Sequence, residues 1–242
     1  MTLSNRKILR TLLCLLAGTL YAVCLSACDA KEPLSENRDA EIESPVIAND
    51  LSNQKVTAIA EDTQGHIWIG TFRGLNKNNV HDYHQYFCTD DSLGLPDNQI
   101  THLLRDSKNR FWVGTVNGVC LYTDKDNFRI IPIEADNKNV RQILEDRNGR
   151  IFLNTGFQLY AYHPREEKIT CVLPEISPGN AFYAQCHIAP DNNLWVMTST
   201  GLRCYDPSTL QLKESVALSG YPYYSYLHNN ELWITGNHTL SI

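Results

Sequence analysis

One sequence element returns five times along this chain, and the spacing of its copies limits the folds that the chain can adopt. The first copy, EDTQGHIWIGTFRGL at residues 61–75, combines acidic residues, a turn, a short apolar stretch and a glycine-containing bend. An aromatic residue anchors each copy, at Trp68, Trp112, Phe152, Trp195 and Trp233. These anchors lie 44, 40, 43 and 38 residues apart, which is the period of a four-stranded propeller blade and too long for a leucine-rich or ankyrin unit. The spacing predicts an all-β propeller chain of about four blades and part of a fifth.

Each copy contains the elements of a β-hairpin. An aspartate opens the turn, where its carboxylate can accept backbone N–H groups of the residues that follow. Three positions later stands a residue able to adopt the left-handed conformation, Gly65, Asn109 or Gly149. The turn aspartates are Asp62, Asp106 and Asp146. The predicted strands cover residues 56–60, 100–104 and 140–144 before the turns, and 67–71, 111–115 and 151–155 after them.

The second strand of each hairpin is apolar at consecutive positions, as expected for a sheet that is covered on both faces. Blades that pack against neighbouring blades meet this condition. The first two copies close the strand with Gly and Thr, at Gly70, Thr71, Gly114 and Thr115. The repeated tryptophans could act as platforms for stacking sugars. Their recurrence at one blade position between apolar neighbours instead favours a core role between blades.

The copies diverge along the chain. Asn154 stands in the third copy where the first two have glycine, and Ala189 stands in the fourth where the others have aspartate. The repeats span about residues 51–242, with cores near residues 56–75, 100–119, 140–156, 184–202 and 223–236.

The first 28 residues have the pattern of an export signal. A basic start precedes an apolar run, and the run ends in Leu-Ser-Ala-Cys at residues 25–28. This ending resembles the lipobox of bacterial lipoproteins, in which the cysteine, here Cys28, is acylated and becomes the new N-terminus. An ordinary secretory signal and an uncleaved anchor are the alternatives. Acylation would hold the protein on a membrane, because stable anchoring takes more than one acyl chain.

Residues 29–50 are acidic and poor in aromatic residues, so they cannot bury enough surface to order themselves, and we expect a flexible tether. Within this stretch, Val46–Ala48 could form a short strand that closes a blade. The whole chain carries a net charge of −6, and the repeat region is mildly acidic. No basic surplus suggests nucleic acid as a partner.

The first repeat carries a family resemblance. From Leu51 to Leu75 the chain reads L-S-N-x-x-V-x-x-I-x-x-D-x-x-G-x-I-W-I-G-T-x-x-G-L, a pattern that resembles the two-component regulator propeller repeat. The second copy matches it closely and the later copies progressively less. The resemblance implies the periplasmic sensor part of a hybrid two-component system protein, typically of gut Bacteroidetes, that responds to glycans.

Two departures from that family shape our expectation. Family sensors carry far more repeats, and they continue into a membrane span and a kinase. After residue 28 no run approaches the roughly 18 consecutive apolar residues that a spanning helix needs. We therefore expect a chain that does not signal by itself, with a truncated or split sensor and a complete protein as the open alternatives.

No pattern in the sequence indicates catalysis, a metal or a cofactor. The Asp-turn element is similar to the Asp-box of sialidases, but it has an extra residue and lacks the arginine cluster and Tyr/Glu pair that such enzymes use. A propeller lyase would use His and Glu on one rim, and the eight histidines are scattered without metal-ligand spacing. His81 and His84 lie close in sequence, and metal binding there is the less favoured interpretation.

Five cysteines remain if Cys28 is acylated, so at least one thiol is unpaired in a monomer. They are Cys88, Cys120, Cys171, Cys186 and Cys204. Cys120 and Cys204 fall at third-strand positions, where a buried free thiol is the favoured role.

A ligand site should lie where variable loops converge on one rim of the propeller. The bends after the second strands and the loops entering the first strands share such a rim. Arg73, Asn98, Gln99 and Asn117 carry donors there that suit sugar hydroxyls or a uronate. Ordinary solvated loops are the competing interpretation.

The sequence predicts an envelope sensor or ligand-binding propeller that is not an enzyme. The alternatives are an envelope scaffold that binds another protein and, less favoured, a propeller lyase or hydrolase. We expect an incomplete ring with an exposed apolar blade face at its C-terminal end, through which the chain self-associates or binds a protein. An oligosaccharide is the expected small ligand.

Overall fold

The computed structural model describes residues 45–89, 93–174, 184–198, 201–218, 222–228 and 231–236. These residues belong to one compact unit, Ile42–Ile242. Their regular structure consists of antiparallel strands and a single 3-10 turn, η1 (Asp124–Asp126). None of them forms a helix with the length and apolar character that crossing a membrane requires. The all-β class predicted from the repeats is confirmed.

The first sheet has the strand order β1-β5-β4-β3-β2. Its strands are β1 (Val46–Ala48), β2 (Val56–Glu61), β3 (Ile67–Thr71), β4 (Gly74–Asn79) and β5 (Asp82–Tyr86). β1 runs antiparallel to β5, with Val46 opposite Gln85. A strand therefore forms inside the stretch predicted as a tether, and it extends the outer edge of the first sheet instead of completing the fifth.

The second, third and fourth sheets are four-stranded meanders in chain order. The second contains β6 (Ile100–Arg105), β7 (Phe111–Thr115), β8 (Gly118–Tyr122) and β9 (Phe128–Ile131). The third contains β10 (Gln142–Glu145), β11 (Ile151–Asn154), β12 (Leu159–His163) and β13 (Lys168–Leu173). The fourth contains β14 (Gln185–Ile188), β15 (Leu194–Thr198), β16 (Gly201–Tyr205) and β17 (Leu212–Ala217). The fifth contains β18 (Pro222–His228) and β19 (Glu231–Gly236).

The hairpin strands agree with the prediction within a residue in the first two copies, and the third copy differs. β10 begins at Gln142, whereas the sequence predicts a strand from residue 140. Val140 instead donates its backbone N–H to the Thr115 carbonyl of the second sheet, at 3.0 Å. Its side chain lies over Gly114, where an added Cβ would come within 3.1 Å of it. The contact between sheets thus takes Val140 out of the ladder.

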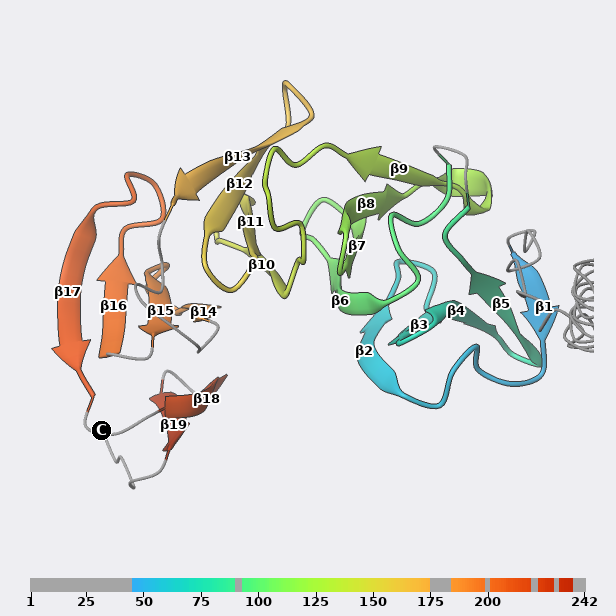
Figure 1. Cartoon of the computed structure of the whole chain (residues 1–242), viewed down its shortest axis with the longest axis horizontal. Coiled ribbons are helices and arrows are strands. Elements are labelled where there is room, and N and C mark those ends of the chain that lie inside the picture. Colours follow the sequence, from blue (N-terminus) through green and yellow to red (C-terminus); the bar gives the residue numbers. More distant parts are fainter. Residues whose placement is uncertain are drawn as a thin grey trace, which may run out of the picture. The chain divides into compact units, whose positions relative to one another are not determined.

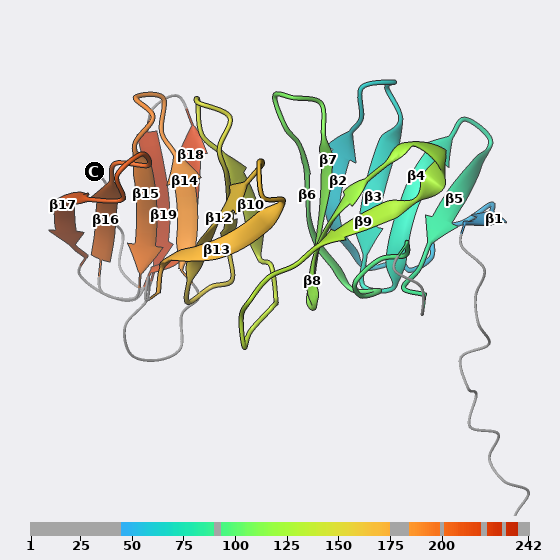
Figure 2. The same cartoon turned by 90° about the horizontal axis from the view of Figure 1, so that it is seen from above.

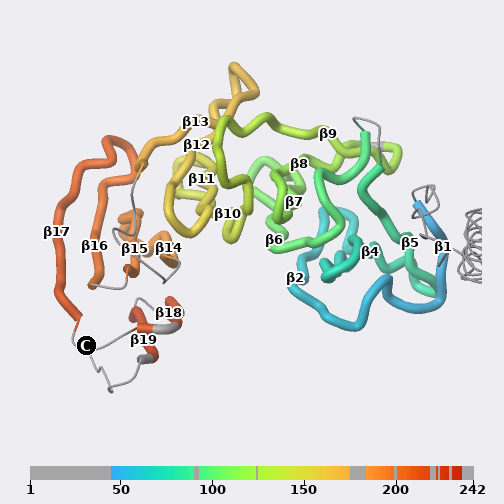
Figure 3. The backbone as a smooth tube through the Cα atoms, viewed as in Figure 1, coloured from blue at the N-terminus to red at the C-terminus, as the bar shows by residue number. Residues whose placement is uncertain are grey.

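The sheets follow one another in chain order, as Figures 1 and 3 show. The first strands of consecutive sheets contact each other, β2 with β6, β6 with β10, β10 with β14 and β14 with β18. The view from above in Figure 2 shows these inner strands running in about the same direction, so that their turns lie at two opposite ends. Within the described residues the fifth sheet does not return to the first, and the sheets are not closed into a ring, as predicted.

Apolar clusters fill the spaces between consecutive sheets. Trp68 packs against Phe111 and Val113 of the second sheet, and Trp112 packs in the same way against the third. Phe152 does so against the fourth. Within β7, Trp112 therefore faces the following sheet while its neighbours Phe111 and Val113 face the preceding one, which explains the consecutive apolar residues of the second strand.

The last two anchoring tryptophans do not lie in a core, contrary to the prediction. Trp195 is only partly buried, and Trp233 is 60% exposed. The reason is that each anchor is covered by the sheet that follows its own. The fifth sheet offers Trp195 only the strands β18 and β19, and no further sheet covers Trp233 within the described residues.

The aspartate of each turn holds the hairpin together. The Asp106 Oδ1 accepts the backbone N–H groups of Lys108 and Arg110 at 3.0 and 2.9 Å, while Oδ2 accepts Trp112 Nε1–H at 2.8 Å. Asp62 binds Trp68 in the same way, at 2.9 Å. The left-handed residues of these turns are those predicted, with φ of +83° at Gly65, +63° at Asn109 and +74° at Gly149.

The five cysteines of the described region are all free. Cys120 and Cys204 are buried in β8 and β16, the third strands of their sheets, as predicted. The same region contains no cluster of three or more metal-ligating side chains. Cys28 and the predicted export signal lie outside the described residues.

Candidate functional site

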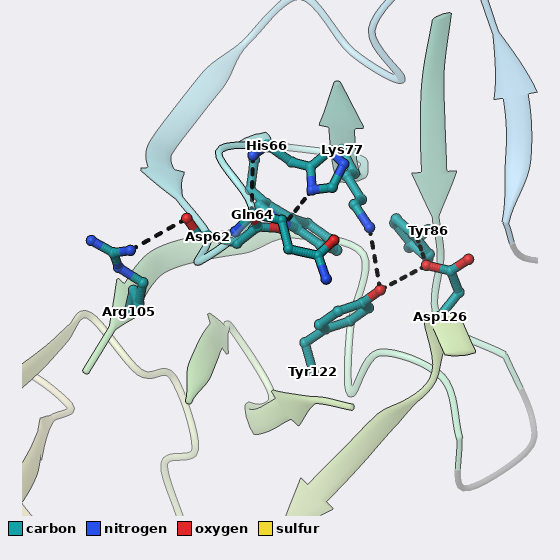
Figure 4. Close-up of polar contacts among 9 residues, drawn as sticks. Asp62, Gln64, His66, Lys77, Tyr86, Arg105, Tyr122 and Asp126 are labelled. Atoms are coloured by element: carbon teal, nitrogen blue, oxygen red, sulfur yellow. Dashed lines mark hydrogen bonds and ion pairs between the residues drawn. The ribbon is translucent and has the colours of Figure 1, made fainter. Parts of the chain in front are cut away.

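A cavity of about 440 Å³ opens at the Asp-turn end of the first two sheets. The turn after β2 forms one wall, and the turn after β6 forms another. The end of β8 and the η1 turn close it from the side of the second sheet. The polar side chains that line it include Asp62, Gln64, Lys77, Arg105, Tyr122 and Asp126, which Figure 4 shows together.

Lys77 occupies a position that is apolar in the next three sheets. It lies opposite Trp68 in the β3–β4 ladder, as Leu121 lies opposite Trp112 in the second sheet. The third and fourth sheets place Ala161 and Cys204 there. Leu121 is buried between sheets. The first sheet therefore has an ammonium group at the position where the second sheet has a buried apolar side chain.

The aromatic rings around Lys77 accommodate its charge. Its Nζ lies 5.3 Å from the centroid of the Trp68 ring and 5.4 Å from that of the Tyr122 ring, within the range of cation–π attraction. The same Nζ donates to the Tyr122 hydroxyl at 3.4 Å. The ammonium group is therefore held at the mouth of the space between the sheets, facing the cavity (Figure 4).

Asp126 is the acceptor at the end of this chain of hydrogen bonds. Its Oδ1 accepts the hydroxyl of Tyr122 at 2.8 Å and that of Tyr86 at 2.7 Å. Burial raises the pKa of the Asp126 carboxyl, but the bonds from the two tyrosines together with the charges of Lys77 and His84 outweigh it, and the net shift is downward. Burial and the bond to Asp126 raise the pKa of both phenols well above the ordinary value. At neutral pH the phenols therefore remain donors and the carboxylate remains ionised.

The two carboxylates of the cavity both accept hydrogen bonds from the protein. Asp62 accepts the backbone N–H groups of Gln64 and His66 at Oδ1, at 2.8 and 3.0 Å, and the Trp68 indole at Oδ2. Burial raises its pKa, and the bond from Trp68, the backbone bonds and the nearby His66 lower it further than burial raises it. Both acids thus serve the protein itself.

The cations of the cavity keep unused donors. Arg105 donates one bond, from Nη1 to the Asp62 carbonyl at 3.3 Å, and its side chain is exposed. Within the described part of the chain, neither Lys77 nor Arg105 has a carboxylate within ion-pair distance. Lys125, also exposed, adds a third positive charge to the lining. The cavity therefore presents cationic donors to a ligand.

The rim residues predicted as a ligand site lie at the opposite end of the same two sheets. Asn98 accepts the backbone N–H of Gly74 with its carbonyl at 2.7 Å, and that of Cys88 with Oδ1 at 2.7 Å. The carbonyl of Gln99 accepts the backbone N–H of Val116 at 3.2 Å. The structure thus brings the two bends and the loop entering β6 together, while the Asn98 amide oxygen is used to hold that loop.

The other two predicted residues, Arg73 and Asn117, have exposed side chains in the bends themselves. Their backbone N–H groups bond to Thr71 and Thr115 Oγ1 at 3.1 and 3.2 Å. The corresponding bend of the fourth copy, at residues 199–200, lies outside the described residues. Ligand binding at this rim stays a prediction.

The sequence contains a signal for the cavity that lies outside the repeated motif. Lys77 is a charged residue at a third-strand position where the other copies are apolar, and a comparison of the copies along β4, β8, β12 and β16 reveals it. Tyr86 and Asp126 could not be found in this way, because β5 and η1 belong to the variable connections between repeats.

No histidine of the described residues lines this cavity, although the His66 ring shares a hydrogen bond with Asp62 Oδ2 at 3.1 Å. Among the described histidines, burial lowers the pKa of His102 and His187. His187 shares a hydrogen bond with Ser225 at 2.7 Å, across the fourth and fifth sheets. His81 and His84, weighed from the sequence as a metal pair, belong to no cluster of three ligating groups in the described region.

The repeats match a known family model. Residues 50–73 and 94–117 each match the model described as two component regulator propeller. No curated protein matches the chain in sequence.

Solved structures share the fold at low identity. The extracellular domain of the hybrid two component system BT4673 from B. thetaiotaomicron aligns with a TM-score of 0.60 and 20% identity, covering 75% of this chain and 26% of that one. Virginiamycin B lyase from Staphylococcus aureus aligns with a TM-score of 0.60 and 18% identity, covering 79% and 67%. The gluconolactonase XC5397 from Xanthomonas campestris aligns with a TM-score of 0.53 and 12% identity, covering 75% and 69%.

Sensors and enzymes thus share this propeller fold, and identities this low show the fold alone. The chain spans about a quarter of the length of the BT4673 domain. The repeat is more specific than the fold, because the match covers the first two strands of each of the first two sheets. This chain is a β-propeller protein that carries the two component regulator propeller repeat at residues 50–73 and 94–117.

Proposed function

We propose that this protein is the ligand-binding propeller of an exported sensor and that its ligand is an oligosaccharide held in the cavity between the first two sheets. One observation carries the proposal: Lys77 and its hydrogen-bonded partners build a charged, polar cavity at a place where the following sheets have apolar core. The match to the two component regulator propeller repeat supports the sensory role.

The lining has the chemistry that sugar recognition uses. Gln64 and Asn109 supply amide groups, and Arg105 supplies a planar fork of donors, all from exposed positions on two turns. Tyr122 adds a partly buried aromatic ring. A few oriented polar groups around a concave surface are typical of a small-molecule site.

The same geometry does not favour catalysis. The two phenols of the cavity hold their protons because of burial and Asp126, so neither can act as a base at neutral pH. Among the described residues, no histidine lines the cavity. A binding role without chemistry fits these groups better than the lyase or hydrolase role of other proteins that share the fold.

Calorimetric titration of the purified protein with a panel of oligosaccharides tests this proposal and places the site. Gln64→Ala removes one amide from the cavity, and Asn109→Gly removes another while keeping the left-handed conformation that Asn109 adopts at φ +63°. We expect the double variant to weaken binding at least tenfold. Asn117→Ala, on the opposite rim, is the matched control.

Loss of binding with Asn117→Ala and not with the double variant would move the site to the rim of Arg73, Asn98, Gln99 and Asn117. Absence of binding to every oligosaccharide would favour the alternative, a scaffold that binds another protein.

Export and acylation at Cys28 belong to this proposal, since a sensor of extracellular sugars must leave the cytoplasm. The support is the basic start, the apolar run and the Leu-Ser-Ala-Cys ending. We expect radiolabelled palmitate to be incorporated by the wild-type protein and not by Cys28→Ala, which should also lose membrane retention. Labelling of the variant would rule out the lipobox.

A further inference from the structure

We propose that the cavity between the first two sheets selects acidic oligosaccharides and that Lys77 and Arg105 each bind a carboxylate of its hexuronate units. This inference rests on the proposed function, because it names the class of sugar for the same site. It is carried by two cationic side chains of the cavity that have no carboxylate within ion-pair distance among the described residues.

The two carboxylates of the cavity already accept bonds from the protein. Asp126 Oδ1 takes two phenol hydroxyls, and Asp62 takes an indole N–H and two backbone N–H groups. The amide groups of Gln64 and Asn109 both donate and accept, so they can serve neutral and acidic sugars alike. A ligand carboxylate accepts only, and it therefore matches the cationic donors of the cavity.

The cationic side chains of the cavity keep N–H donors that form no bond within the described residues. Lys77 Nζ has one long bond, at 3.4 Å to Tyr122, and an ammonium group can donate three. Arg105 has one bond, at 3.3 Å to a carbonyl, out of five N–H donors. Neither has a carboxylate within ion-pair distance in the part of the chain that the structure describes, although the charge of Lys77 acts on Asp126 from farther away. Carboxylates of a ligand would supply a direct partner to each.

The position of Lys77 strengthens this conclusion. An ammonium group at an inter-sheet position loses part of its hydration, and two aromatic rings with a tyrosine hydroxyl replace that hydration only in part. In such a setting a charge-assisted bond to a ligand is stronger than one formed in bulk water. Lys77 therefore contributes more to selecting an anion than an exposed surface lysine would.

The test compares an acidic oligosaccharide with its carboxyl-reduced form, in which each uronate has become the neutral sugar. Trigalacturonate and triglucuronate, each paired with its reduced counterpart, are titrated calorimetrically into the full-length protein. We expect an acidic form to bind at least tenfold more tightly than its neutral counterpart, and we expect the difference to shrink as salt is raised.

Variants assign the preference to the two cations. Lys77→Met and Arg105→Met should each weaken binding of the acidic form by about tenfold to a hundredfold, the effect of one hydrogen bond to a charged group. Lys168→Met, which removes a lysine paired with Glu134 in the third sheet, should leave binding unchanged. Arg105 is exposed, so its variant keeps the test valid if Lys77→Met unfolds.

The outcomes separate the two proposals. If the reduced oligosaccharides bind as tightly as the acidic ones, the preference for acidic sugars is wrong while the proposed function stands. If acidic forms bind and neither cation variant weakens them, the assignment to Lys77 and Arg105 is wrong. If other oligosaccharides of the wider panel bind and these two pairs do not, the inference fails alone. If nothing in the panel binds, the proposed function fails with it.

Discussion

At the residue scale, an aspartate and an aromatic residue six positions later act as a pair. Asp106 and Asp62 each accept the indole N–H of the tryptophan that follows. In the third copy that residue is Phe152, which has no donor, and Asp146 Oδ2 is left buried without a hydrogen bond. The same turn is therefore satisfied in two copies and incompletely satisfied in the third.

This difference predicts unequal costs for removing the aspartates. Asp106→Ala should destabilise the protein by about 3 kcal/mol, because it leaves a buried indole N–H and turn amides without an acceptor. Asp146→Ala should cost less by about 1–2 kcal/mol, since Asp146 Oδ2 accepts neither an indole nor, unlike Asp106 Oδ2, an arginine Nε–H. Chemical denaturation of both variants measures the difference, and equal costs would show that these bonds to Oδ2 contribute nothing.

A second prediction at this scale concerns pH. The folded-state pKa of Asp126 is depressed, with the bonds from Tyr86 and Tyr122 and the nearby positive charges together outweighing burial. Its contribution to stability is therefore fully present above the unfolded pKa, about 3.9, and is lost as pH falls through the lower folded value. Asp126→Asn should reduce the acid-induced loss of stability below about pH 4. Thermal unfolding between pH 7 and pH 2 measures this loss, and parallel curves for variant and wild type would contradict the assignment.

At the element scale, each sheet is completed by the next one. The anchor of one hairpin packs on the second strand of the following hairpin, as Trp68 does on Phe111, with ring centroids 5.0 Å apart. The glycine after the anchor makes room for this contact, because a Cβ at Gly70 would lie 2.5 Å from Ile100 of the next sheet. Asn154 replaces that glycine in the third sheet and bonds to Gln142 and to the Ala184 carbonyl, both at 2.7 Å. This junction thus adds polar bonds to an apolar cluster.

The same Trp→Ala substitution should have different costs in the second and the fifth sheets. Trp112→Ala should cost about 3–5 kcal/mol, the range for deleting a buried aromatic side chain, because Trp112 is fully buried between the second and third sheets. Trp233→Ala, at the equivalent strand position of the fifth sheet, should cost less than about 1 kcal/mol because its side chain is exposed. Equilibrium unfolding of both variants provides the measurement. A small cost for Trp112→Ala would return the tryptophans to the role of exposed stacking platforms.

At the scale of the whole described unit, the outer faces of the first and fifth sheets are uncovered. Ile59 of β2 is 65% exposed and lies opposite Ile69 in the ladder with β3. Trp233 and Tyr226 lie opposite each other in β18 and β19, and both are exposed. These are the two kinds of face that pack together at the internal junctions, one with an aromatic anchor and one with aliphatic residues. Uncovered apolar faces of this kind favour association.

We accordingly expect the protein to self-associate at micromolar concentration and to bind a dye that reports exposed apolar surface. Trp233→Gln should shift sedimentation velocity profiles toward the monomer. Phe72→Gln, which changes an exposed apolar residue in a bend between β3 and β4, should not. A compact wild-type monomer that does not bind the dye would refute this expectation.

The sequence by itself determined the fold class, the period of the sheets and the turn and strand chemistry of each hairpin. These features depend on neighbouring residues, such as Asp62 with Gly65 and Trp68, whose interactions are encoded within one repeat. It also indicated correctly which thiols are buried, since Cys120 and Cys204 share a strand position.

Only the tertiary structure decided which repeated positions are core and where a cavity forms. The burial of Trp68 and the exposure of Trp233 follow from the presence or absence of a following sheet within the described residues, which no local pattern records. Lys77 bonds to Tyr122 of β8, and the network continues to Asp126 of η1 and Tyr86 of β5. A site built between two sheets needs contacts across 40 to 45 residues of chain, and the sequence motif describes only one sheet at a time.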